Sequence, residues 1–161
     1  IDIGGQDTKV IRIDEKGRVT EFEMNDKCAA GTGRFIEVMA KALNVDLDQI
    51  GDLSLKFNKE LAISSICTVF AESEVISLVS EGEALEDILY GIHKAIAGRT
   101  MGLMNRLGGA EGEVVMTGGV AKNSGVVKAL ENTLNTKLTI YAEPQIIGAL
   151  GAAIIASEKA V

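Results

Sequence analysis

Apolar and polar residues alternate over the first part of the chain, and this alternation predicts short strands. Ile1 to Gly5 reads as a strand that runs into a turn, and Lys9 to Asp14 alternates apolar with polar side chains. A turn at residues 15–18 leads into a further alternating run from Val19 to Met24. A period of two is typical of half-buried strands, and short turns join antiparallel neighbours. We therefore expect residues 1–24 to form an antiparallel meander of three strands.

From residue 33 to residue 107 the apolar positions recur every three or four residues instead. This spacing is typical of amphipathic helices that bury one face. It predicts helices over residues 33–43, 45–53, 70–80 and 84–107. Residues 61–69 are rich in β-branched residues and serine, which favours a strand or another extended segment.

The last third of the chain alternates strands with helices. Strands first and then a β-α-β-α order is typical of a layered α/β domain with a mixed sheet. Proline suits the first turn of a helix, where its missing N–H is not needed. The predicted elements are a strand at 113–116, a tight turn at Gly118-Gly119, a helix at 121–134, a strand at 137–141 and a helix at 145–159 that follows Pro144.

Length and composition narrow the function classes. The chain has 161 residues, 47% of them apolar, which is enough for one domain with its own core. The net charge of −7 argues against non-specific binding to nucleic acid or to anionic membranes. No apolar run reaches the ~18 residues of a membrane span, and no basic leader precedes the opening IDIGGQD. We therefore expect a cytoplasmic protein, and the opening isoleucine inside a strand predicts a fragment or a processed chain.

Two pairs of glycines at strand ends are the first candidate chemistry. The segment Gly4-Gly5-Gln6-Asp7 follows the first strand, and Gly118-Gly119 follows the strand at 113–116. Glycine lets backbone N–H groups approach phosphate oxygens, and Asp2 and Asp7 could hold Mg²⁺ through water. The alternative is that each pair only makes a tight turn. The sequence contains no P-loop motif and no G-x-G-x-x-G after its first strand, which argues against P-loop and dinucleotide-binding proteins.

The two cysteines are the second candidate chemistry. Cys28 and Cys67 each precede a predicted helix and have small neighbours, and a helix N-terminus stabilises a thiolate. Two thiolates cannot complete a tetrahedral metal site or a [4Fe–4S] cluster, so the simplest completion is two cysteines from each of two chains. Two inert, buried thiols are the alternative. His93 is expected to lie on a packed or solvated helix face rather than to act as a ligand.

Six segments together carry a resemblance to a known family. In chain order they are IDIGGQDTKV (1–10), MNDKCAAGTGRF (24–35), ISSICTVFAESEVIS (63–77), GIH (91–93), VVMTGGVAKNSGV (114–126) and GALGAA (148–153). They resemble the ATP-dependent activators of 2-hydroxyacyl-CoA dehydratases and the related ATPase subunits of benzoyl-CoA reductase, the BadF/BadG/BcrA/BcrD ATPase family. The resemblance covers the whole chain and includes both cysteine motifs.

The resemblance implies an α/β fold: one lobe of the actin/hexokinase/heat-shock ATPase (ribonuclease H-like) fold, with a mixed sheet and helices on both faces. Residues 1–161 would be a single domain, the second (C-terminal) lobe of a two-lobed ATPase. The phosphate-binding turn of the first lobe is absent from this sequence. Gly148 and Gly151 would lie where the two lobes pack closely.

The same resemblance implies a role for each motif. Cys28 and Cys67 would ligate one [4Fe–4S] cluster shared across a homodimer, and the catalytic residues would be Asp2, Gln6 and Asp7. The nucleotide-binding residues would be Gly4, Gly5, Gln6 and Asp7 in the phosphate turn, Gly31, Thr32, Gly33 and Arg34 in the loop between cluster and nucleotide, Glu37 at the ribose, and Gly118, Gly119, Val120 and Asn123 in the adenosine turn.

The implied activity is electron transfer coupled to ATP hydrolysis. An electron from a ferredoxin or flavodoxin would pass through the [4Fe–4S] cluster to a 2-hydroxyacyl-CoA dehydratase, while ATP and Mg²⁺ drive closure of the lobes. The runner-up is a phosphotransferase lobe like those of sugar or acetate kinases, with Asp7 or Asp26 as general base. A structural or regulatory actin-like domain with inert thiols is the third possibility. Iron content separates the first reading from the other two.

Overall fold

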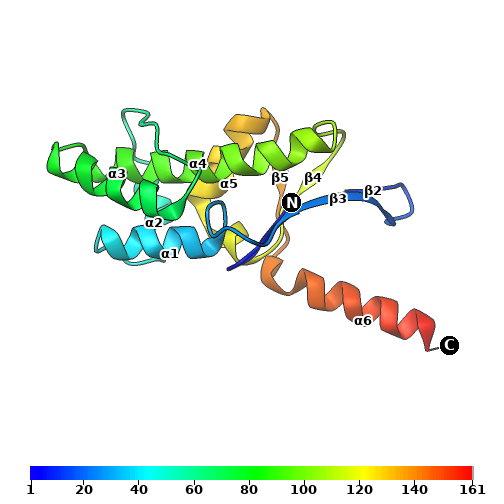
Figure 1. Cartoon of the computed structure of the whole chain (residues 1–161). Helices are drawn as coiled ribbons and strands as arrows, with labels where there is room; N and C mark the ends of the chain where they lie inside the picture. The colour runs from blue at the N-terminus through cyan, green and yellow to red at the C-terminus, as the bar shows by residue number, and fades with distance from the viewer. Residues whose placement is uncertain (161) are drawn as a thin grey trace.

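The computed structural model describes residues 1–160, and its first three strands form an antiparallel meander (Figure 1). Strands β1 (Asp2–Ile3), β2 (Thr8–Ile13) and β3 (Val19–Asn25) lie in the order β1-β2-β3. The register of β2 against β3 shifts at Arg12/Ile13, where a bulge bends the hairpin. The predicted meander is confirmed.

Two further strands extend this sheet. Strands β4 (Val114–Val115) and β5 (Leu138–Thr139) pair in parallel, as a β-α-β order requires. A parallel bridge between Asp2 and Thr117 joins them to the meander, and the Ile3 amide donates to the Thr117 carbonyl at 3.1 Å. The five strands therefore make one mixed arrangement in which β1 lies between β2 and the β4–β5 pair.

The helices follow the predicted order. They are α1 (Gly33–Ala42), α2 (Ile50–Ser54), α3 (Thr68–Ser80), α4 (Leu85–Arg106), α5 (Ser124–Leu134) and α6 (Ile147–Lys159), with 3₁₀ turns η1 (Gly119–Lys122) and η2 (Pro144–Ile146).

Three predicted boundaries are wrong. The helix expected over 45–53 begins only at Ile50, because Asn44 takes a left-handed conformation (φ 53°) and the aspartates after it favour turns. Of the two alternatives expected for residues 61–69, a strand is not formed, while Cys67 is extended (φ −145°, ψ 136°), and α3 begins at Thr68, two residues earlier than expected. The helix expected over 121–134 is divided, since Asn123 is extended (ψ 106°) and separates η1 from α5.

Helix α4 is the centre of the core. Its buried side chains Ile88, Leu89, Ile92 and Ile96 pack against α1, α3 and α5 in the main hydrophobic cluster. Burying one such side chain stabilises the fold by roughly 1.5–3 kcal/mol. A second cluster, made of Val10, Leu103, Met104 and Val114, fills the space between the end of α4 and the strands. Both clusters pack against Ile1, directly before β1, and this packing fixes the strand ends at which the glycine turns begin.

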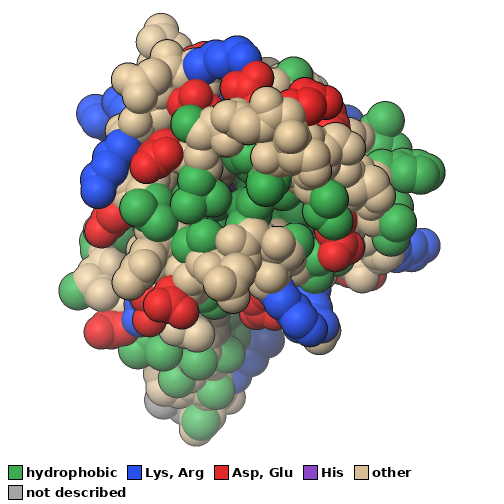
Figure 2. Space-filling model, turned by 90° about the vertical axis from the view of Figure 1, so that its left-hand side faces the viewer, with side chains coloured by type: hydrophobic (Ala, Val, Ile, Leu, Met, Phe, Trp, Pro, Cys, Tyr) green, Lys and Arg blue, Asp and Glu red, His purple; other side chains and the backbone are tan. Residues whose placement is uncertain are grey.

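Helix α6 is different, because none of its residues is buried. In Figure 1 it lies on the opposite side of the strands from α4, so helices flank both faces of the sheet. Its apolar residues Leu150, Ile154 and Ile155 remain about half exposed, and the hydrophobic side chains at the bottom of Figure 2 belong to this projecting helix. None of the helices in the described part of the chain has both the length and the apolar character that crossing a membrane requires.

Candidate functional site

The hairpin between β1 and β2 forms the first glycine turn. The Gly4 amide donates to the Asp7 carbonyl at 2.9 Å, and Gly5 and Gln6 are exposed at the tip. Within residues 1–160 neither of the two tip amides has a backbone acceptor. Unpaired backbone N–H groups at such a turn are suited to donate to an anion such as a phosphate.

Helix α1 starts directly on this turn. The Gly33 amide donates to the Gly4 carbonyl and the Arg34 amide to the Gly5 carbonyl, both at 2.8 Å. A Cβ atom at Gly33 would lie 3.1 Å from the Gly4 oxygen and 3.3 Å from Val120. The sequence therefore needs glycine here because three backbone segments meet, and the positive end of the α1 dipole is held at the turn.

The second glycine turn packs against β1. Gly118 has φ 87° and ψ 171°, a conformation open essentially to glycine, and a Cβ there would lie 2.3 Å from the Ile3 oxygen. Gly119 begins η1, and Asn123 caps α5 by accepting a hydrogen bond from the Val126 amide at 3.0 Å. The second turn and the N-terminus of α5 that follows it therefore lie next to the first turn.

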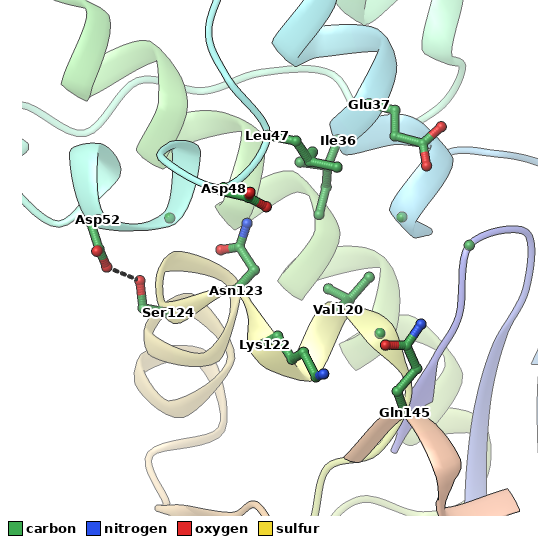
Figure 3. Close-up of a pocket in the computed structure, with 14 residues that line it drawn as sticks. Ile36, Glu37, Leu47, Asp48, Asp52, Val120, Lys122, Asn123, Ser124 and Gln145 are labelled. Atoms are coloured by element: carbon green, nitrogen blue, oxygen red, sulfur yellow. Dashed lines mark hydrogen bonds between the residues drawn. The ribbon is translucent and has the colours of Figure 1, made fainter. Parts of the chain in front are cut away.

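A pocket of about 680 Å³ opens between these elements (Figure 3). Its volume is in the range of small-molecule sites. Six residues predicted for the nucleotide site line it: Gly5, Gly33, Glu37, Gly119, Val120 and Asn123. Eight lining residues were missed by the sequence analysis: Ile36, Leu47, Asp48, Gly51, Asp52, Lys122, Ser124 and Gln145.

The walls of the pocket are partly apolar and partly polar. Figure 3 shows Asp48 and the Asn123 amide directed toward each other, with Ile36 and Leu47 close above. On the α2 side the Ser124 hydroxyl donates to Asp52 at 2.7 Å. An apolar wall with a few placed polar groups is typical of a site that binds a nucleoside-sized ligand.

One signal in the sequence pointed to the missed wall. Gly51 lies inside a predicted helix, where glycine costs about 1 kcal/mol relative to alanine and so indicates a close approach. In the structure a Cβ at Gly51 would lie 2.8 Å from the Ser124 hydroxyl. The remaining missed residues carry no such signal, because only the tertiary fold brings them to the pocket.

The other predicted nucleotide and catalytic residues lie around the pocket without lining it. Asp2 accepts a hydrogen bond from the Thr117 hydroxyl at 2.6 Å, at the junction of the two sheets. Asp7 forms an ion pair with Lys9, and Arg34 one with Glu37 at 2.8 Å. Gly4, Gln6, Gly31, Thr32 and Gly118 complete the turns and the loop behind the pocket.

The loop before α1 is fixed from inside. The fully buried Thr32 hydroxyl donates to the Ala29 carbonyl at 2.7 Å. The buried Thr8 hydroxyl donates to the Gly31 carbonyl at 2.7 Å, and the left-handed Gly31 (φ 90°) leaves room for the Arg99 side chain, whose Cγ would lie 2.8 Å from a Cβ. The loop therefore has one well-defined course from the cysteine to the glycine turn.

The two cysteines come from segments that lie next to each other. The Cys28 sulfur is 4.0 Å from the carbonyl oxygen of Ile66, the residue before Cys67. Cys67 is the N-cap residue of the 13-residue helix α3, and Asn25 holds the Cys28 carbonyl at 2.7 Å. Both thiols are only half-buried, so they can reach a ligand at the surface.

This donor set fits half of a four-cysteine cluster. Two soft sulfur ligands at a helix N-terminus suit iron. Among residues 1–160 no group of three or more His, Cys, Asp and Glu side chains could complete the set within one chain. His93 lies elsewhere: it is fully buried, contacts Ser54 at 2.9 Å, and burial lowers its pKa to about 3. The expectation that it lies on a packed helix face is confirmed.

Comparison with known proteins shows the family to which the chain belongs. The family model described as the BadF/BadG/BcrA/BcrD ATPase family matches residues 1–156. This chain belongs to that family. It is 53% identical to the 2-hydroxyisocaproyl-CoA dehydratase activator of Clostridioides difficile and 55% identical to the activator of lactoyl-CoA dehydratase of Anaerotignum propionicum. Each comparison covers 99% of this chain and 60% or 61% of the relative.

Solved structures agree with this family assignment. Component A of the (R)-2-hydroxyglutaryl-CoA dehydratase of Acidaminococcus fermentans has a TM-score of 0.94 at 54% identity, over 99% of this chain and 61% of the other. The Clostridium difficile activator with bound ADPNP has a TM-score of 0.91 at 51% identity, over 99% and 62%. The expected fold class, one lobe of the actin-like ATPase fold, is confirmed. The chain spans about three fifths of the length of these family members.

Proposed function

We propose that this chain is the nucleotide- and cluster-binding part of an ATP-dependent activator. It would pass an electron to a 2-hydroxyacyl-CoA dehydratase or to a partner like benzoyl-CoA reductase. Relatives of more than 50% identity are named as such activators. Family membership favours this function over the kinase-like phosphotransferase and the non-catalytic actin-like domain.

One observation carries the proposal. The short loop at residues 28–34 begins at Cys28 and ends beside the first glycine turn. There the Gly33 amide donates a hydrogen bond to the Gly4 carbonyl. Because Thr8 also holds the Gly31 carbonyl, the loop is bonded to the strand that follows the turn. A change of position at a bound phosphate would therefore be transmitted to Cys28 through a few hydrogen bonds, which is a physical basis for coupling.

The nucleotide would occupy the pocket with its phosphates at the first turn. The free amides of Gly5 and Gln6 would donate to phosphate oxygens, and Asp2 and Asp7 would hold Mg²⁺ through water. The adenosine would lie toward Val120 and Asn123, and Glu37 would approach the ribose. The solved relative that carries ADPNP supports ATP or ADP as the ligand.

Cys28 and Cys67 would supply two of the four ligands of a [4Fe–4S] cluster, and a second copy of the chain would supply the other two. When bound, the cluster provides one-electron transfer. Beside Cys67, the apolar side chains of Ile66, Val69 and Phe70 are 64–75% exposed. Such a patch next to a half-complete ligand set favours a homodimer at this end of α3.

A second lobe would complete the nucleotide site. The chain would then be the C-terminal lobe of a two-lobed ATPase, and the uncovered apolar face of α6 would pack against the first lobe. Among residues 1–160 no atom lies within 4 Å of a Cβ built at Gly148 or Gly151, which leaves this helix open to close packing. Donation of the electron by a ferredoxin or flavodoxin belongs to the same proposal.

The deciding experiment measures iron and acid-labile sulfide per chain after anaerobic reconstitution, together with the mass in solution. We expect about two irons per chain in a dimer, as half of a cubane requires. Cys28→Ser and Cys67→Ser should each abolish iron binding while Mg·ADP binding remains. Asn25 holds the Cys28 loop without being a sulfur donor, so Asn25→Ala is a matched control that should retain iron. Iron at the wild-type level in both serine variants would overturn the ligand assignment.

A further inference from the structure

Helix α2 forms one wall of the pocket but has little of its own to keep it in place. It has five residues, and its N-terminus has no side-chain cap. A helix of this length is not stable in isolation, so its position depends on tertiary contacts. Gly51 and Asp52 from this helix line the pocket, and the orientation of α2 therefore sets the shape of the wall.

Behind this wall lies a buried chain of hydrogen bonds. The Ser54 hydroxyl donates to the Gly51 carbonyl at 2.6 Å, and the Nδ1 atom of His93 lies 2.9 Å from the same hydroxyl oxygen. Ser54 and His93 are both fully buried. These two hydrogen bonds thus connect the last turn of α2 to the middle of α4, the central helix of the core.

The number of hydrogens on the Ser54 hydroxyl decides which group donates in each of these two hydrogen bonds. A hydroxyl has one hydrogen, and Ser54 gives it to Gly51, so Ser54 accepts from His93. Burial lowers the pKa of His93 to about 3, so the ring is neutral; with its proton on Nδ1, Nε2 carries no hydrogen, in accord with the finding that Nε2 has no partner among residues 1–160. A neutral imidazole acts here as a fixed donor, and exchanging it for an apolar side chain removes the hydrogen bond that the Ser54 oxygen accepts.

The side chains of Ser54 and His93 are closely packed against the start of α5. A Cβ at Gly125, in the first turn of α5, would lie 2.1 Å from the Ser54 hydroxyl and 2.3 Å from His93 Nδ1. On the pocket side, Ser124 bonds Asp52. Helix α2 is thus held between α4 and the start of α5, by a buried contact on one side and by a contact at the pocket on the other.

We propose that His93 and Ser54 are positioning residues for the nucleoside pocket: their hydrogen bond fixes α2, and through it Gly51 and Asp52, against the start of α5. Neither residue touches the pocket. The inference rests on the proposed function in one respect, namely that this pocket holds the nucleotide. It assigns a role to the GIH motif (91–93), which the nucleotide and cysteine motifs leave unexplained.

The test measures the affinity for Mg·ADP in the full-length protein by calorimetry, beside the melting temperature of each variant. Ser54→Ala and His93→Leu should each weaken binding about three- to tenfold, the range for residues that act through a neighbouring element. The double variant should lose no more than Ser54→Ala alone, because that change already removes the bond to His93 together with the bond to Gly51. His93→Asn keeps a donor at the position of Nδ1 and should bind nearly as well as wild type, whereas His93→Gln places its amide at the Nε2 end and should not.

A matched control separates positioning from general stability. The Thr100 hydroxyl is fully buried on the same helix α4 and bonds the Ile96 carbonyl at 3.1 Å, away from the pocket. Thr100→Val should lower the melting temperature and leave the affinity for Mg·ADP unchanged. If affinity instead follows the melting temperature in every variant, or if Ser54→Ala binds like wild type, the positioning role is wrong.

The same data distinguish the two levels of the proposal. If wild type binds Mg·ADP and only the positioning pattern fails, the proposed function stands and this inference is overturned. If wild type binds no Mg·ADP, the nucleotide site itself is refuted, and the inference falls with it. Additive losses in the double variant would also contradict the inference, since they would show two independent effects.

Discussion

Acidification should unfold this protein through a single, identifiable histidine. His93 is the only histidine in the chain, and burial lowers its pKa to about 3 from an ordinary value of 6.5. In the unfolded chain the imidazole is exposed and binds a proton below pH 6.5. The folded state is therefore fully stable above pH 6.5 and loses stability as the pH falls toward 3, where both states become protonated.

The magnitude follows from the shift. Between pH 6.5 and 5.0 the imidazole is protonated in the unfolded state but not in the folded state. Over these 1.5 pH units, protonation lowers the free energy of the unfolded state by about 1.36 kcal/mol per unit. His93 alone should thus cost about 2 kcal/mol of unfolding free energy between pH 7.5 and pH 5.0. The carboxyl groups of Asp14 and Asp87 contribute below this window, because ordinary carboxyl pKa values lie near 4 and hydrogen bonds to backbone amides lower the pKa values of these two further.

Urea unfolding at pH 7.5 and 5.0 tests this, with His93→Asn as the reference. The asparagine variant lacks the titrating group, so the difference between the two proteins removes all other ionisations. Wild type should lose about 2 kcal/mol more than the variant on acidification. In proton NMR the single histidine resonance should not titrate above pH 5. Equal pH dependence of the two proteins, or a midpoint near 6.5, would refute the buried neutral imidazole.

Two backbone predictions test the turns. Gly118→Ala should destabilise the fold by about 3 kcal/mol or more, because its backbone conformation excludes a Cβ that would strike the Ile3 carbonyl, whereas Gly119→Ala should be nearly neutral; thermal melts compare the two. Thr8→Val should cost about 1–3 kcal/mol, since the Gly31 carbonyl loses a buried donor. Faster hydrogen exchange confined to residues 28–34 would check that second change, and uniform exchange would contradict it.

Much of the fold could be predicted from the sequence, and the failures have physical causes. The period of two over residues 1–24 and the helical period of α4 were strong signals, because each element buries one face against the core. Composition predicted a strand or another extended segment over residues 61–69, and no strand formed there in the described residues, because β-branched residues alone do not create a pairing partner.

Only the part of the pocket that is made by local sequence motifs could be predicted. Gly5, Gly33 and Gly119 could be predicted because they lie in glycine motifs, two of them directly after strands, although only at Gly33 does a close backbone approach require glycine. On the opposite wall, Asp52 comes from a helix that is much shorter than the one expected at 45–53, and Asp48 comes from the turn before it. Its contribution depends on Ser124 and His93, which lie 72 and 39 residues from their partners, and no local pattern encodes such pairs.

The convergence of glycines on the end of β1 explains why the first glycine turn and the cysteine loop form one unit. The first residues of α1 donate to the Gly4 and Gly5 carbonyls. The 117–119 turn accepts a hydrogen bond from the Ile3 amide, and Gly118 lies against the Ile3 carbonyl. Any side chain at Gly33 or Gly118 would separate these segments by opening a gap. The link between a phosphate at the turn and the thiol of Cys28 therefore runs through backbone contacts. Substitutions of polar side chains in the pocket should alter nucleotide affinity, whereas only changes at the convergence itself should uncouple the turn from the loop.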